Sequence, residues 1–397
     1  MAHASAGRSS PSLKLLLSFS TPLHSTTVTT FDVTKAIEHT SNMFSTVAGN
    51  HLLYKGAALY ATTTAFAAFW LTVRQPIQAG KEGPYNVHRP TYPMASSSQG
   101  SLIKTALITG GASGMGLEVA KALANRGAWH VHLLDLNAER GKQAVTTIGI
   151  HQATFHEINV LDYDALANTF HQVYHSSNRL DFVFANAGIV ERFNFYESHP
   201  IGKPPPPPDQ SVIDLNLKSV INTVWLSQHY FRQSTQSHDK NLIITASVGA
   251  IYRCQVSPSY CASKHAVLGL MRSIAPHFYR YDGIRVNAIC PASVKTNLLD
   301  STAWNTFPHD VFVPIEKVVE ACLLLIDGKD SENRLLEPEL AHESTNGATG
   351  GVTDGHRLFG HAVELSGLKM YDRRQPGYAD AHLARCMKAT ERDTYLE

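Results

Sequence analysis

"TGGASGMG", residues 109–116, follows the apolar run "TALI" and leads into the helix-like segment "MGLEVAKALANRG". Its glycines at 110, 114 and 116 permit a tight turn and let backbone N–H groups approach a phosphate. The positive end of a helix that begins near Met115 favours such an anion. A strand, a glycine-rich turn and a helix in this order predict a dinucleotide-phosphate site, with contacts from Gly110, Ser113, Gly114, Met115 and Gly116.

Outward from this turn, short apolar runs alternate with helical patterns. Strands are predicted at residues 105–109, 131–135, 153–159, 180–185, 241–246, 284–290 and 361–366. Helices are predicted at residues 115–127, 162–175, 209–233, around Tyr260, and at 314–328. The alternation predicts an α/β fold, a Rossmann-type doubly wound parallel sheet, in one catalytic domain over residues 103–370. Residues 371–397 are expected to form a polar C-terminal tail.

The composition argues against several classes of function. The 397 residues carry a formal net charge of +1, so we expect no nucleic-acid partner. The 21 histidines show no HExxH or comparable ligand spacing, and we predict no metal. The five cysteines form no CxxC pair, which argues against a disulfide framework and favours a reducing compartment. We therefore expect the catalytic domain to be cytoplasmic.

Residues 1–100 form an N-terminal extension that we expect to be largely unstructured. Its first 31 residues hold no acidic side chain and are rich in Ser and Thr, as in mitochondrial transit peptides and in unstructured tails. Residues 56–73 are eighteen uncharged residues, which as a helix would span about 27 Å. They predict either a transmembrane attachment or an amphipathic helix. Residues 82–101 have the composition of a Pro/Ser/Gly linker.

A second unusual segment lies inside the predicted domain. The run "GKPPPPPDQ", residues 202–210, separates a predicted strand from a long predicted helix. Consecutive prolines favour a stiff polyproline II conformation. We expect a spacer, and the alternative is a docking site for a proline-reading domain.

An acidic residue ends the second predicted strand. Asp135 stands nineteen residues after Gly116, in "HLLDLN". A carboxylate at this point can accept hydrogen bonds from the hydroxyls of an adenosine ribose and would repel a 2′-phosphate. The position favours NAD over NADP. An NADP-binding protein would need a basic residue here instead, for which Arg140 is the only near candidate.

A tyrosine and a lysine lie four positions apart in "YCASKHAVLG", residues 260–269. On a helix this spacing places Tyr260 and Lys264 on one face. A phenol has a pKa near 10 and is a poor base at neutral pH, and a neighbouring ammonium group favours the phenolate. The pair therefore predicts a proton-transferring phenol, provided that other residues place a substrate beside it.

Those other residues resemble the classical short-chain dehydrogenase/reductases. The turn has the T-G-x-x-x-G-x-G spacing of that family, and "ANAG" at 185–188 resembles its N-N-A-G. Asn216 follows in "DLNL", and Ser247 precedes Tyr260 by thirteen residues. The stretch "IRVNAICP", residues 284–291, and Thr296 resemble the segment that passes beside the nicotinamide. The resemblance covers residues 103–370, and motifs in this order are highly specific.

The resemblance implies an NAD-dependent oxidoreductase that interconverts a secondary alcohol and its ketone. Tyr260 would be the acid/base and would also contact the cofactor. Lys264 would hold the nicotinamide ribose, and Ser247 would bind the substrate oxygen. Asn216 would maintain a water-linked proton path. It also implies a homodimer or homotetramer, paired through the helices of Asn216 and Tyr260. Further cofactor contacts would come from Asn159, Val160, Asn186, Ala187, Gly188, Pro291, Val294 and Thr296.

The segment after Thr296 predicts the nature of the substrate. Its large apolar side chains could wall a pocket closed by a lid, which favours a lipophilic alcohol or ketone over a sugar. These side chains are Leu298, Leu299, Trp304, Phe307 and Phe312. Pro276 should end or kink the helix of Tyr260. Three alternatives stay open: an NADP-linked ketoreductase, a non-catalytic nucleotide-binding sensor or scaffold, and a protein that chiefly tethers a membrane.

Overall fold

The computed structural model describes residues 103–330, 334–336 and 357–390. By its contacts the chain divides into two compact units, 1–92 and 93–397, and all described residues belong to the second. The predicted extension over residues 1–100, with its segments 56–73 and 82–101, therefore lies outside the described residues. Within the described part, no helix combines the length and apolar character needed to cross a membrane.

One twisted sheet organises the described residues, and it confirms the predicted fold class. Its strand order is β3-β2-β1-β4-β5-β6-β8-β9-β7. Every pair of neighbours from β3 to β8 is parallel, and β8 and β9 are antiparallel. The strands are β1 Lys104–Thr109, β2 Trp129–Asp135, β3 Ala153–Glu157, β4 Phe182–Ala185, β5 Lys240–Thr245, β6 Ile284–Pro291, β7 Leu335–Leu336, β8 Ala362–Ser366 and β9 Lys369–Asp372.

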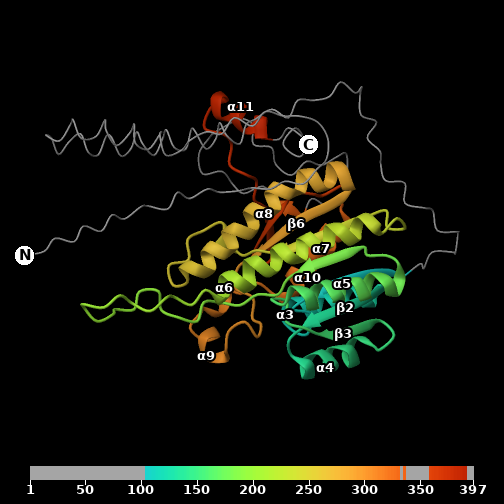
Figure 1. Ribbon diagram of the computed structural model, residues 1–397, viewed down its shortest axis with the longest axis horizontal. Coiled ribbons are helices and arrows are strands. Elements are labelled where there is room, and N and C mark those ends of the chain that lie inside the picture. Colours follow the sequence, from blue (N-terminus) through green and yellow to red (C-terminus); the bar gives the residue numbers. More distant parts are fainter. Residues whose placement is uncertain (1–102, 331–333, 337–356, 391–397) are drawn as a thin grey trace, which may run out of the picture. The chain divides into compact units, whose positions relative to one another are not determined.

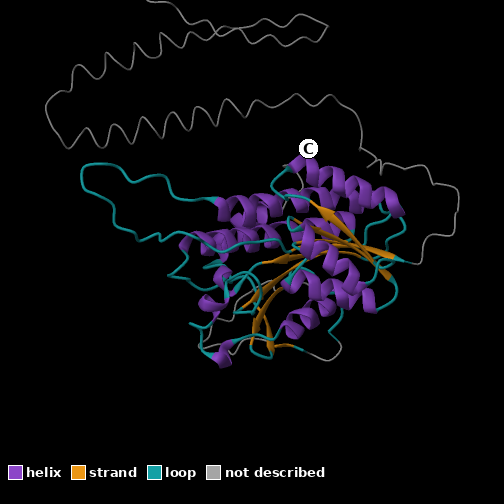
Figure 2. Ribbon diagram, turned by 90° about the horizontal axis from the view of Figure 1, so that it is seen from below, coloured by secondary structure: helices purple, strands orange, loops and turns teal. Residues whose placement is uncertain are grey.

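Helices cover both faces of this sheet. Figure 2 shows the strands between two helical layers, as a doubly wound sheet requires. The helices are α3 Gly114–Asn125, α4 Ala138–Ile148, α5 Tyr163–Ser177, α6 Ser211–Ile213, α7 Ser219–Gln233, α8 Pro258–Asp282, α9 Ser301–Trp304, α10 Ile315–Asp327 and α11 Ala381–Thr390. In Figure 1 the long helices α7 and α8 run beside each other.

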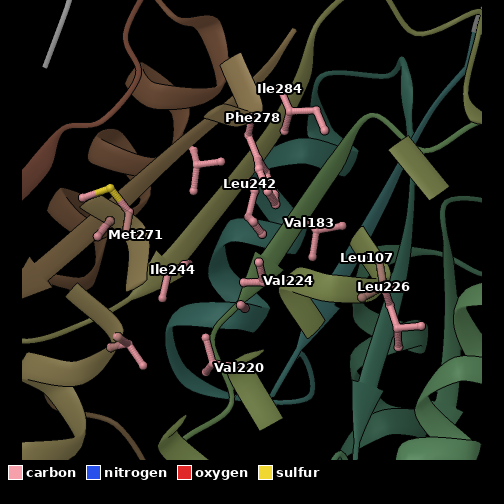
Figure 3. Close-up of a cluster of buried hydrophobic side chains, with 14 of the residues drawn as sticks. Leu107, Val183, Val220, Val224, Leu226, Leu242, Ile244, Met271, Phe278 and Ile284 are labelled. Carbon is pink, nitrogen blue, oxygen red and sulfur yellow. The ribbon is translucent and has the colours of Figure 1, made fainter. Parts of the chain in front are cut away.

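Two apolar clusters hold these layers to the sheet. Successive side chains of a strand point to opposite faces, so Leu107 of β1 faces α5, α7 and α8 while Ile108 faces α3 and α10. In Figure 3, Leu107, Leu242 and Ile244 of the strands lie among side chains of α7 and α8. The parallel strands are buried on both faces, which explains their continuous apolar runs.

Four elements were missing from the sequence prediction. The first, α4, is a surface helix with few apolar residues, and the Asn137 side chain caps it by accepting a hydrogen bond from the Arg140 N–H at 2.9 Å. The second, β9, turns back from β8 through Gly367 at φ 55° and extends past the predicted domain boundary at residue 370. The edge strand β7 and the helix α11 complete the set, and α11 lies within the predicted tail.

The catalytic-helix candidate α8 does not end at Pro276. The prediction was that Pro276 ends or kinks the helix, and its first alternative is wrong because the helix continues through this proline to Asp282. A proline inside a helix removes one backbone hydrogen bond, which tertiary contacts can offset. Ala275 and Phe278 on either side are buried in the core, and this packing holds the last turns of α8 against the sheet.

The connection between β4 and α6 is long and exposed. In both views the loop that contains residues 195–210 extends away from the rest of the domain. The five prolines 204–208 are all exposed, and so are Phe195, Tyr196 and Ile201. The loop returns the chain to α6, directly before the segment that carries Asn216.

A buried histidine pair makes the stability of the domain depend on pH. His132 of β2 and His156 of β3 are joined by a hydrogen bond of 3.0 Å between their rings. Burial, together with the nearby His130 and His156, lowers the pKa of His132 to about 3. Burial lowers the pKa of His156 as well. The His132 ring is therefore neutral in the folded protein at pH 5, where it would be charged in the unfolded chain.

We expect acid to destabilise the domain through this pair. The unfolded chain binds more protons between pH 6.5 and pH 3, so stability falls as pH decreases through this window, by about 2 kcal/mol at pH 5 for His132 alone. Urea unfolding at pH 7 and pH 5 measures this loss of stability. The loss should be smaller in His132→Gln than in wild type. It should be unchanged in His171→Gln, because His171 is exposed. An unchanged pH dependence in His132→Gln would contradict the assignment.

Candidate active site

The glycine-rich turn between β1 and α3 has a backbone that only glycine accommodates. Gly114 has φ 54°, a left-handed conformation that side chains rarely adopt. A Cβ atom on Gly116 would lie 2.4 Å from the Gly110 carbonyl oxygen, closer than atoms can approach. These positions let the first turn of α3 come directly against the end of β1.

The N-terminus of α3 is suited to a phosphate. Ser113 occupies the N-cap position, but its side chain makes no capping hydrogen bond. The first N–H groups of a helix have no partner within the helix, so an uncapped N-terminus binds anions. The turn therefore fits the pyrophosphate of a dinucleotide, which the positions of Gly114, Met115 and Gly116 would hold.

Asp135 lies beside this turn at the end of β2. Its carboxylate accepts hydrogen bonds from the Ala112 N–H at 3.2 Å and from the Asn137 N–H at 3.1 Å. The carboxylate is thereby fixed where a ribose would follow the pyrophosphate. Asn159 and Val160 lie just after the end of β3, the strand next to β2 at the edge of the sheet. The Asn159 side chain accepts a hydrogen bond from the Leu161 N–H at 3.0 Å.

Asn186, in "ANAG", stabilises the glycine-rich turn through hydrogen bonds of its side chain. Its amide nitrogen donates to the carbonyl oxygens of Thr109 at 3.2 Å and Gly110 at 3.3 Å. Its amide oxygen accepts from the Thr245 hydroxyl at 3.1 Å, which ties the turn to β5. Ala187 follows, with its N–H bonded to the Thr109 hydroxyl at 3.1 Å. The structure thus gives Asn186 a supporting role toward the turn.

Asn216 lies in a π-helical turn, Asp214–Lys218, between α6 and α7. Such turns are rare and often occur at functional sites. The buried side chain of Asn216 accepts from the Ile189 N–H and donates to the Ile189 carbonyl, each at 2.9 Å. It also donates to the Ser263 hydroxyl at 3.2 Å. The amide therefore clamps the segment after "ANAG" to α8.

Ser247, Tyr260 and Lys264 converge above the ends of β5 and β6. The Lys264 Nζ donates to the Thr245 carbonyl at 2.9 Å and lies 5.6 Å from the centre of the Tyr260 ring. The Ser247 hydroxyl accepts from the Gly249 N–H at 3.0 Å and is hydrogen-bonded to the Tyr260 phenol. Carboxyl ends of parallel strands are where α/β sheets place their ligand sites.

Burial dominates the electrostatics of these groups. It raises the pKa of the Tyr260 phenol, while the hydrogen bond with Ser247 acts in the opposite direction. It also lowers the pKa of the Lys264 ammonium to about 8, so most of this group is charged at pH 7. The expectation that Lys264 favours the phenolate is thus outweighed in this structure, because desolvation penalises any charge at the ring.

These side chains border a cavity of about 620 Å³, whose wall is mostly apolar. The predicted residues that line it are Met115, Asn186, Gly188, Ser247, Tyr260, Lys264, Pro291, Val294, Thr296, Leu298, Leu299, Trp304 and Phe307. The cavity joins the glycine-rich turn to the phenol within one space. Among the described residues, no group of three or more His, Cys, Asp or Glu side chains could hold a metal ion.

Comparison with known proteins explains this combination. The family described as "short chain dehydrogenase" matches residues 104–305, which is half of the chain. A short-chain dehydrogenase/reductase of Penicillium rubens, prx7, is 42% identical over 282 residues, with 70% of this chain and 96% of the relative covered. The chain belongs to the short-chain dehydrogenase family. It is therefore an oxidoreductase acting on CH–OH groups with NAD or NADP as acceptor.

A second relative tests a more specific prediction, a likeness to one member of the family. The segments "YCASKHAVLGL" and "RVNAICPASVKTNLLDS" predict a likeness to 15-hydroxyprostaglandin dehydrogenase and its relatives. The human protein named 15-hydroxyprostaglandin dehydrogenase [NAD(+)] is 32% identical over 203 residues, with 50% of this chain and 71% of that protein covered. The prediction of this likeness is confirmed at the level of sequence.

Solved structures support the fold of this short-chain dehydrogenase. A 3-ketoacyl-(acyl-carrier-protein) reductase from Brucella melitensis, complexed with NADH, has a TM-score of 0.52 at 19% identity, covering 66% of this chain and 97% of that one. A structure described as ElxO with NADP bound has a TM-score of 0.51 at 19% identity, with the same two coverages. At this identity the likeness concerns the fold alone.

The segment after Thr296 forms one side of the dehydrogenase cavity. The Trp304 indole N–H donates to the Thr296 carbonyl at 2.8 Å, so α9 is tied to the end of β6. Phe312 does not line the cavity. It packs on Trp304 with ring centres 5.9 Å apart, and the Lys295 ammonium lies 4.3 Å from the centre of the Phe312 ring. Phe312 thus supports the wall from behind.

Other residues that line the cavity were not predicted from the sequence. The segment after Ser247 contributes Tyr252, Cys254 and Val256 to the cavity, and the loop after β4 contributes Glu191. None of these follows a periodic pattern, because each reaches the site by a tertiary contact. No pattern within one short window of the sequence marks them as part of the site.

Proposed function

We propose that this short-chain dehydrogenase interconverts a lipophilic secondary alcohol and its ketone with NAD. The observation that carries the proposal is the convergence of Ser247, Tyr260 and Lys264 on one mostly apolar cavity. When bound, the nicotinamide cofactor supplies the hydride acceptor or donor. Everything else in the reaction falls to side chains of this chain.

The residues divide the remaining work. Tyr260 takes the hydroxyl proton of the alcohol, or returns it to the ketone, at the substrate oxygen. Ser247 would hold that oxygen by a hydrogen bond, and it opposes the rise that burial causes in the pKa of the phenol. Lys264, mostly charged at neutral pH, adds a positive charge one helical turn away and would hold the nicotinamide ribose. Asn216 joins the segment between α6 and α7 to α8 through its hydrogen bond with the Ser263 hydroxyl. Asn216 would also maintain a water-linked proton path.

The residues beside the glycine-rich turn support the choice of NAD over NADP. Asp135 presents a fixed carboxylate beside the turn, where the ribose hydroxyls would donate to it and a 2′-phosphate would be repelled. Arg140, the candidate for an NADP phosphate, lies in the first turn of α4 and is exposed. The human relative is named for NAD(+), which agrees with this choice.

The cavity wall supports a lipophilic substrate. Its apolar lining residues include Val256, Leu298, Leu299, Trp304 and Phe307. A sugar would leave many of its hydroxyl groups without partners against such a wall, which costs binding energy. An aliphatic or aromatic chain on either side of the carbinol would instead bury apolar area.

Pairing of subunits belongs to the same proposal. A homodimer or homotetramer formed through α7 and α8 would cover Ile221 and Trp225, large apolar side chains that lie exposed on α7. Sedimentation velocity of the full chain distinguishes these assemblies from a monomer.

The first test is titration of the full chain with NADH and NADPH, followed by turnover of a panel of lipophilic secondary alcohols. We expect tighter binding of NADH and NAD-dependent oxidation that is absent in Tyr260→Phe. Tight NADH binding without turnover across a broad panel would favour a nucleotide sensor or scaffold. Preferential binding of NADPH would overturn the cofactor assignment and favour a ketoreductase.

A further inference from the structure

The N-terminus of the catalytic helix α8 lacks a cap of its own. Ser257 occupies the N-cap position, but its side chain makes no capping hydrogen bond. Pro258 follows at the first helical position and has no N–H to satisfy. The backbone donors of Ser259 and Tyr260 therefore need partners from outside the helix. Tyr260, the proposed acid/base, thus stands in the first turn, where helices fray most readily.

A carboxylate from a distant loop satisfies both donors. The Glu191 Oε2 accepts from the Ser259 N–H at 2.7 Å and from the Tyr260 N–H at 3.0 Å. Glu191 is 68 and 69 residues away in the sequence from these two donors, in the loop after β4. A negative charge at a helix N-terminus is stabilising, and a carboxylate accepting backbone N–H groups makes strong hydrogen bonds.

The other half of the Glu191 carboxylate has no partner among the described residues. Its second oxygen, Oε1, is buried there without a hydrogen-bond donor. A buried acceptor without a donor costs free energy, so the side chain is retained at a cost. The hydrogen bonds of this buried acid therefore stabilise the first turn of α8. The loop is itself fixed two residues earlier, by the clamp of Asn216 on Ile189.

We propose that Glu191 is a positioning residue for the reaction, because it caps the catalytic helix and so fixes Tyr260 relative to the substrate oxygen. The inference rests on the proposed function. It predicts that removal of the cap lowers kcat without affecting the nucleotide site, since the turn between β1 and α3 makes none of these contacts. A displacement of about 1 Å at a reacting group can cost up to about 100-fold in rate.

The experiment compares variants of Glu191 in the full chain. We expect Glu191→Ala to lower kcat by about tenfold or more, with the Kd for NADH within about twofold of wild type. Glu191→Gln keeps an oxygen that can accept both N–H groups, and we expect it to restore kcat to within about threefold. Glu191→Asp, which is shorter by one methylene, should lie between them. Rates are normalised to NADH-binding sites, so loss of folded protein does not enter kcat.

A matched control removes a cap elsewhere. Asp162 caps α5 by accepting from the Ala165 N–H at 3.0 Å, and Asp162→Ala should lower stability and leave kcat unchanged. Hydrogen exchange over residues 257–264 gives a second readout, in which the first turn of α8 should exchange faster in Glu191→Ala or Glu191→Asp than in wild type. This measurement needs no substrate, so it decides whether the cap exists even if no alcohol is turned over.

Three results would overturn the inference. Glu191→Ala could retain kcat, Glu191→Gln could be as impaired as Glu191→Ala, or kcat and NADH binding could fall together. Failure of the proposed function looks different, because then wild type shows no turnover that Tyr260→Phe removes. If Glu191→Ala does not fold, Glu191→Asp and Glu191→Gln still separate these outcomes through kcat and hydrogen exchange.

Discussion

Tyr260→Phe should abolish nearly all turnover of a secondary alcohol. The substitution removes one hydroxyl and keeps the ring, which is mostly buried beside Ser247 and Lys264. General acid/base catalysis contributes about 10²–10⁴-fold to a rate, so kcat should fall by that factor. Binding of NADH should change by no more than about twofold, because the substitution removes one hydroxyl at the nicotinamide end and leaves Lys264, Asp135 and the turn between β1 and α3 in place.

The wild-type pH profile provides an independent check on Tyr260. Burial raises the pKa of its phenol, so alcohol oxidation, which needs the phenolate, should increase with pH through the neutral range. The residual rate of Tyr260→Phe should lack this dependence. A variant with kcat within about tenfold of wild type, or with the same pH profile, would exclude Tyr260 as the acid/base.

Substitution of Asp135 should change the choice of cofactor. In Asp135→Ser the ribose hydroxyls lose a charged acceptor, and such hydrogen bonds contribute roughly 1.5–3 kcal/mol each. NADPH gains at the same time, since the carboxylate that repels its 2′-phosphate is removed. The ratio of the NADPH and NADH dissociation constants should therefore shift toward NADPH by about 100-fold or more.

Asp135→Asn is the matched control for this change. The two N–H groups of Ala112 and Asn137 bond to different oxygens of the Asp135 carboxylate, so the single amide oxygen of asparagine can keep one of these hydrogen bonds while the charge is removed. Fluorescence titration with both cofactors measures the ratio. We expect Asp135→Asn to relieve the repulsion of NADPH and to keep part of the NADH affinity. An unchanged ratio in both variants would show that the selectivity resides elsewhere.

The parts of this protein that follow local rules could be predicted from the sequence. The turn at Gly110 to Gly116 needs glycine for backbone reasons, and the spacing from Tyr260 to Lys264 is set by helix geometry. The strands of the central sheet are buried on both faces, which leaves unmistakable apolar runs. Each of these signals lies within one short window of the chain.

The missing parts depend on contacts between distant segments. The missing strand β9 pairs with the predicted strand β8, and the two carry Asp372 and Glu364, buried acids that a hydrophobicity pattern assigns to the surface. Glu364 is paired with Arg373, and Asp372 accepts from His361 at 3.0 Å, and no single window shows these partners. Glu191 escaped prediction for the same reason. Its partners lie on α8, more than sixty residues away in the sequence.

The loop after β4 is held at Ile189 and Glu191, so the exposed residues 195–210 are mechanically separated from the cavity. Asn216 fixes Ile189 and the first turn of α8 fixes Glu191, so a change beyond these points transmits little strain to the site. Each doubling of a flexible loop costs only about 0.6 kcal/mol. We therefore expect this projection to accept an inserted affinity tag, fluorophore or guest domain without loss of turnover.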